Sequence, residues 1–141
     1  MIIAPYCFYV QRCRTSYLNP SFHSIVINCY KYVEVNRKYG KELNLIIPEM
    51  AAFKNRFVKE ISENRAITEL RNDYVAHVSS DSKNRALTNE EVQSKNFSIV
   101  GGSHADEFLD WVCPDNIEHT ELQNSLVGTI QLLRDAVAAK L

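Results

Sequence analysis

Glycine and proline are scarce in this sequence, with four of each among 141 residues. This scarcity excludes collagen-like and Gly/Pro-rich disordered architectures. No apolar run approaches the roughly 18 residues that a membrane-spanning helix requires. The first ten residues are uncharged but lack the basic start and small-residue cleavage site of a signal peptide. We therefore expect a cytoplasmic protein that makes no membrane contact.

Metal-binding and common catalytic motifs are also missing. The four cysteines are spread through the chain as Cys7, Cys13, Cys29 and Cys113. They form no Cys-x-x-Cys pair, and the spacing of Cys113 from His104 and His119 matches no zinc pattern. Glycine-rich phosphate loops, Gly-x-Ser-x-Gly elbows and His-Glu-x-x-His helices are absent. We therefore expect free thiols, no metal and no cofactor.

The charge is nearly balanced, with 16 basic and 17 acidic residues and a formal net charge of -1. No global positive field attracts nucleic acid, so any contact with RNA must be local. Apolar residues at 45% and charged residues at 23% are typical of a folded globular chain. The length favours one domain over residues 1–141.

Apolar stripes at spacings of three and four residues predict helices along most of the chain. The expected helices cover residues 5–17, 20–40, 48–61, 64–78, 103–112 and 115–141. Pro20 is suited to a first helical turn, and Gly40 is expected to end the second helix. The short apolar segment 43–47 is interpreted as a packed connection. These elements predict an all-α fold, an antiparallel bundle of about four to five main helices.

A polar segment follows the fourth helix at residues 79–103 and ends with Gly101-Gly102. Its composition predicts a flexible crossover loop that could form a rim or lid over a site. Thr88 and Glu91 within it have the spacing of a capping box, so the loop could contain a short helix.

Residues 70–77 read Leu-Arg-Asn-Asp-Tyr-Val-Ala-His and combine polar side chains with an apolar stripe. At about 100° per residue, Leu70 and Tyr74 share a face with the apolar positions before and after them. Arg71 and His77 flank this face and diverge by about 120°. Asp73 precedes His77 by four residues, so its carboxylate could orient the imidazole.

This stretch resembles the signature of HEPN domains, and especially of their abortive-infection branch. The similarity is carried by Arg71-Asn72, followed after four residues by His77 in an Ala-His context. The resemblance implies a helical bundle and a metal-independent ribonuclease of the kind found in toxins and abortive-infection systems. It also implies that Arg71, Asn72, Asp73 and His77 form the site, although many family members are inactive binding modules.

Metal-free cleavage of RNA begins when the 2′-hydroxyl attacks the adjacent phosphate. His77 suits the role of acid or base because its unperturbed pKa is near 6.5. Arg71 suits the stabilisation of charge on the phosphate because its planar fork stays protonated. Since the two side chains diverge on one helix, two copies are needed to complete a site. We therefore expect a homodimer whose interface includes Leu70 and Tyr74.

Other interpretations remain open. The chain could be an inactive HEPN-like module that binds a nucleotide, an RNA or a partner protein such as an antitoxin, or a structural helical protein. Arg71 could be a strut between helices, paired with Asp73, Glu69 or Glu63. A basic stretch in the second helix is interpreted as a solvated face. It consists of Lys31, Arg37, Lys38 and Lys41.

Overall fold

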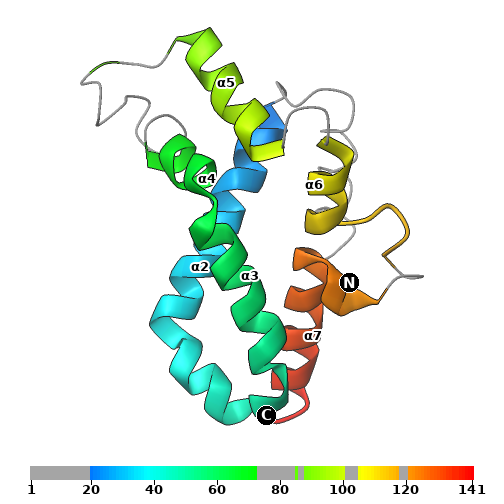
Figure 1. Ribbon diagram of the computed structural model, residues 1–141. Helices are drawn as coiled ribbons and strands as arrows, with labels where there is room; N and C mark the ends of the chain where they lie inside the picture. Colours follow the sequence, from blue (N-terminus) through cyan, green and yellow to red (C-terminus); the bar gives the residue numbers. More distant parts are fainter. Residues whose placement is uncertain (1–19, 73–84, 86–87, 101–104, 118–120) are drawn as a thin grey trace.

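The computed structural model describes residues 20–72, 85, 88–100, 105–117 and 121–141 (Figure 1). Six α-helices occur in these ranges: α2 Pro20–Ile46, α3 Ala51–Glu63, α4 Arg65–Leu70, α5 Asn89–Val100, α6 Ala105–Val112 and α7 Leu126–Ala138. Short 3-10 turns at Pro48–Met50 and Leu122–Asn124 precede α3 and α7. The described residues contain no β-strand, so the predicted all-α fold is confirmed. In the same residues, we find no helix that could cross a membrane.

Helix α2 begins at Pro20, as predicted, but continues to Ile46. The predictions that Gly40 ends this helix and that residues 43–47 form a connection are therefore wrong. Gly40 lacks the left-handed backbone of a terminating glycine and instead faces α3, where a Cβ would lie 3.5 Å from Nζ of Lys54. The amide of Ile47 still donates to the carbonyl of Leu43 at 2.9 Å.

Helix α3 runs back along α2 in the opposite direction (Figure 1). It buries Phe57 and Ile61, together with Lys54, whose amine donates to Oδ1 of Asn55 at 2.9 Å. Burial lowers the pKa of the Lys54 amine. The side chain of Tyr32 on α2 completes this contact by donating to the carbonyl of Lys54 at 3.1 Å.

Asn64 separates α3 from α4. Its backbone is extended, with φ -79° and ψ 91°, and its side-chain oxygen accepts a hydrogen bond from the amide of Ile67 at 3.3 Å. This is the N-cap arrangement in which Asn satisfies an amide of the first helical turn. The helix expected to start at residue 64 therefore starts at Arg65.

Helix α5 begins with the predicted capping box. The amide of Thr88 donates to Glu91 at 2.9 Å, and the amide of Glu91 donates to the Thr88 hydroxyl at 3.2 Å. The helix continues for 12 residues because Val92, Asn96 and Ile99, spaced by four and three, are buried on one face. It is therefore longer than the short helix expected in segment 79–103; the rest of that segment, apart from Arg85, lies outside the described residues.

Helices α6 and α7 close the core beside α3. Trp111 of α6 packs at 5.4 Å, centroid to centroid, from Phe57, and its indole donates to Oε2 of Glu60 at 2.7 Å. Helix α7 starts later than expected, at Leu126, because Ser125 caps it by accepting from the amide of Gly128 at 3.1 Å.

The cysteines depart from the expectation of free thiols. Cys29 is free and buried, and burial raises the pKa of its thiol to about 12. Cys113 is disulfide-bonded, so the expectation is wrong for this residue. The predicted helix over residues 5–17 lies outside the described residues.

Candidate functional site

Half of the predicted motif lies in the described structure. Arg71 follows the last residue of α4, and its amide donates to the carbonyls of Ile67 and Thr68. The motif residues Asp73, Tyr74 and His77 lie outside the described residues, so their predicted roles stay predictions.

The guanidinium of Arg71 is held between the motif and α2. Nη1 donates to Oδ1 of Asn72 at 2.8 Å, and Nη2 donates to Oε1 of Glu34 at 3.2 Å. Its Cζ lies 4.5 Å from the ring centroid of Tyr30, which is cation–π geometry. Tyr30 and Glu34 are four residues apart on α2 and therefore share one face of that helix.

Arg71 remains accessible despite these contacts. Its side chain is 29% exposed, and that of Glu34 is 47% exposed. An arginine fork carries five N–H groups. Two of them donate to Asn72 and Glu34, and no described residue accepts a hydrogen bond from the others. Arg71 thus has an ordered orientation and donors left to bind an anion.

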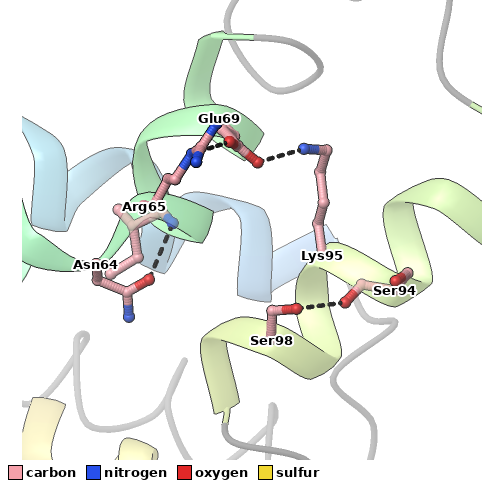
Figure 2. Close-up of polar contacts among 7 residues, drawn as sticks. Asn64, Arg65, Glu69, Ser94, Lys95 and Ser98 are labelled. Atoms are coloured by element: carbon pink, nitrogen blue, oxygen red, sulfur yellow. Dashed lines mark hydrogen bonds and ion pairs between the residues drawn. The ribbon is translucent and has the colours of Figure 1, made fainter.

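The ion pair of Arg71 is with neither Glu63 nor Glu69, two of the three partners weighed from the sequence; the third, Asp73, lies outside the described residues. Glu63 pairs with Lys59 at 3.9 Å. Glu69 lies between Arg65 on its own helix and Lys95 on α5, at 2.6 Å and 2.9 Å (Figure 2). Arg71 does connect two helices, as the strut interpretation requires, but the carboxylate belongs to α2.

Glu69 fixes the motif helix against α5. The hydrogen bond from Lys95, with a further contribution from Arg65, holds the pKa of the Glu69 carboxyl below its usual value. The carboxylate is therefore charged at neutral pH and bridges two cations. This bridge and the pair formed by Arg71 attach both sides of the short helix α4 to neighbouring helices.

Leu70 lies in the core and not at the surface, where a residue of a dimer interface has to lie. Its side chain is 0% exposed, packed in the core of its own chain together with Ile67. The burial of the apolar face is as predicted, but the prediction that Leu70 contacts a second copy is wrong, because it has no surface to offer. Helix α4 packs against α2 and α5 of the same chain.

Tyr30 and Glu34 are the residues that the sequence did not identify. Nothing distinguishes either of them from the other tyrosines and glutamates of the chain. Their only shared signal is the four-residue spacing on a predicted helix. They reach Arg71 through packing of α2 against α4, which no local pattern encodes.

No cluster of three potential metal ligands occurs among the residues that the structure describes. The disulfide at Cys113 removes this residue as a thiolate ligand. His104 and His119, which were weighed with it, lie outside the described ranges.

Comparison with known proteins gives one informative match. No family model matches the chain, and no curated protein matches it. Among solved structures, the integron cassette protein Vpc_cass2 from the mobile metagenome of V. paracholerae is 42% identical. The match covers 96% of this chain and 87% of that one, with a TM-score of 0.78. The chain therefore belongs to the same protein family as the integron cassette protein Vpc_cass2.

Proposed function

We propose that this protein is a HEPN-like, metal-independent endoribonuclease whose site consists of Arg71, Asn72, Asp73 and His77. The observation that supports the proposal is the state of Arg71, which is ordered by Asn72 and Tyr30 yet 29% exposed. An ordered, accessible guanidinium beside the motif suits the recognition of a phosphate. The relative Vpc_cass2 is described by its origin and not by an activity, so the proposal depends on the motif and on these contacts.

In the proposed reaction, the 2′-oxygen of a ribose bonds to the adjacent phosphorus and the bond to the 5′-oxygen breaks. His77 takes the proton of the attacking hydroxyl or supplies one to the leaving 5′-oxygen. Arg71 stabilises the charge that develops on the non-bridging oxygens. Asn72 orients Arg71 through the 2.8 Å hydrogen bond, and Asp73 orients His77.

The proposed active form is a homodimer, because the helix expected over residues 64–78 would separate Arg71 and His77 by about 120°. With Leu70 buried in its own core, Tyr74 is the remaining candidate for the interface. RNA is the proposed substrate, and a protein antitoxin is a candidate partner in a phage-defence or toxin-type system. The proposed location is the cytoplasm. The disulfide at Cys113 argues against this location, because such bonds are rare where thiols are kept reduced.

A second candidate function is an inactive HEPN-like module that binds a nucleotide, an RNA or a protein. The carboxylate of Glu34 favours it, since this group lies 3.2 Å from Nη2 of Arg71 and competes with any phosphate. A purely structural role for the same ion pair is the third interpretation. Both alternatives predict a folded protein without cleavage.

The test is incubation of the purified protein with mixed RNA in EDTA, beside Arg71→Ala and His77→Ala. The proposal predicts cleavage by the wild type and its loss in both variants. Arg65→Ala is the matched control, because Arg65 is an exposed arginine on the same helix that pairs with Glu69. If the wild type and the three variants all leave the RNA equally intact or degrade it equally, the proposed enzyme activity is rejected. Binding of RNA without cleavage favours the inactive module.

A further inference from the structure

The exposed face of α2 carries four basic side chains that have no ion pair with any described residue. They are Lys31, Arg37, Lys38 and Lys41. The amine of Lys38 lies 5.0 Å from the ring centroid of Tyr39, and this contact leaves its charge unneutralised.

The basic side chains at the surface of the other described helices are paired with carboxylates. On α3, α4, α5 and α7, each exposed or partly exposed lysine or arginine lies within 4 Å of a carboxylate. The pairs are Arg56–Glu60, Lys59–Glu63, Arg65–Glu69, Lys95–Glu69 and Arg134–Asp135. Only α2, among the described helices, presents a group of unpaired cations, so its positive charge is a local property in a chain of net charge -1.

Two members of this group share a face of α2 with the residue that Arg71 contacts. Because α2 does not end at Gly40, one continuous helix carries all four cations. At about 100° per residue, Arg37 and Lys41 lie within about 20° of Tyr30, the residue on which Arg71 stacks. Lys41 follows Arg37 by about one turn, or about 6 Å along the axis. Arg37 and Lys41 therefore form a row that leads from Tyr30 toward the C-terminal end of α2, with Lys31 and Lys38 about 100° and 80° to one side of it.

Few carboxylates offset this charge. Glu34 is occupied by Arg71, and Glu42 is the other acidic residue on the exposed side of α2 between residues 31 and 42. Five cations, counting Arg71, and two carboxylates leave a local charge of +3. Unpaired cations in a row bind phosphates without regard to base sequence and release counterions when they do so.

We infer that Lys31, Arg37, Lys38 and Lys41 form a binding track for the backbone of single-stranded RNA that leads to Arg71. The inference rests on the proposed function, because it treats Arg71 as the point where a phosphate is engaged. It specifies a substrate that extends several nucleotides beyond the reacting phosphate, and binding that depends on charge and length more than on sequence.

The test is binding of a fluorescein-labelled 12-nucleotide RNA with 2′-O-methyl groups, which prevent cleavage. Fluorescence anisotropy is measured between 50 and 200 mM salt for the wild type, for the track variant Arg37→Gln/Lys38→Gln/Lys41→Gln, and for the control Arg56→Gln/Lys59→Gln/Arg134→Gln. Both variants lose three exposed cations, and the control residues lie on α3 and α7.

We expect the track variant to bind at least about tenfold more weakly at 50 mM salt. Its plot of log K against log salt should be shallower by about 2, since each phosphate contact on a single strand contributes about 0.7. The control should stay within about twofold of the wild type. Equal weakening in the two variants, or no binding by the wild type, overturns the inference.

Cleavage assays on the unmodified RNA separate this inference from the proposed function. RNA binding that depends on the track, without cleavage, supports the track and rejects the enzyme. The opposite result is cleavage that is lost in His77→Ala, while the track variant binds and cleaves RNA as the wild type does. That result supports the enzyme and rejects the track.

Discussion

Nη2 of Arg71 lies 3.2 Å from Oε1 of Glu34, a residue that precedes it by 37 positions and belongs to another helix. This pair connects the motif helix α4 to α2. It also places a carboxylate where an RNA phosphate would have to bind. Removal of the Glu34 carboxylate therefore has different effects on RNA binding if Arg71 acts in a site and if Arg71 only joins two helices.

The substitution Glu34→Gln separates the role of Arg71 in phosphate binding from its role as a link between helices. Because both side chains are solvent-accessible, we expect the free energy of unfolding to fall by less than about 1 kcal/mol. If Arg71 binds phosphate, RNA affinity at low salt should rise severalfold once the competing carboxylate is gone. Glu42→Gln is the matched control, as an exposed glutamate on α2 without a contact to Arg71. Affinities that rise equally in the two variants would assign the effect to net charge alone.

Gly40 and Gly128 both lie inside helices but should respond oppositely to alanine. Gly40→Ala should raise stability by about 0.5–1 kcal/mol, because Ala loses less backbone entropy and its Cβ would make an ordinary contact with Lys54. Gly128→Ala should lower stability by about 1–3 kcal/mol, because its Cβ would collide with the backbone of Leu122. Urea unfolding measures both values. A stabilising Gly128→Ala would show that this packing is incorrect.

The capping box of α5 gives a prediction about local stability. Thr88→Ala should cost about 1 kcal/mol, because it leaves the amide of Glu91 without its side-chain acceptor. Thr88→Ser keeps the hydroxyl and should cost much less. Hydrogen exchange of the first turn of α5 should report the same order. Equal protection in the alanine and serine variants would contradict the cap.

The bridge at Glu69 should make the attachment of α4 sensitive to acid. The folded pKa of this carboxyl is lowered, chiefly by the hydrogen bond from Lys95, so its stabilising effect is present above the ordinary pKa near 4.5 and is lost as pH falls through the lower folded value. Glu69→Gln should therefore be less stable than the wild type at pH 7, by less than about 1 kcal/mol because the site is partly exposed. The difference should disappear at a pH below that lowered folded pKa. If the two proteins still differ in stability at that pH, the difference comes from packing and not from the charge of Glu69.

Local chemistry was sufficient to predict much of the fold. Pro20 and the Thr88–Glu91 box marked helix starts that are present in the structure. Gly40 was misinterpreted as a helix end. Glycine satisfies two different needs, a left-handed turn and a close approach of helices, and the sequence does not say which one applies.

The surroundings of the site were not predictable to the same degree. The apolar face with Ile67 and Leu70 was identified, yet the partner that covers it was taken to be a second copy instead of the chain itself. The contacts of Arg71 with Tyr30 and Glu34 depend on how α2 crosses α4. Spacing within one helix carries no information about such a crossing.

The most direct test of the proposed chemistry uses an RNA oligonucleotide and a copy in which every ribose is 2′-deoxy, both incubated with the wild type in EDTA. Attack by the 2′-hydroxyl predicts cleavage of the RNA alone, with 2′,3′-cyclic phosphate ends, and no cleavage by Arg71→Ala or His77→Ala. RNA that stays intact at micromolar protein, or cleavage that is equal in the wild type and the two variants, would contradict the account.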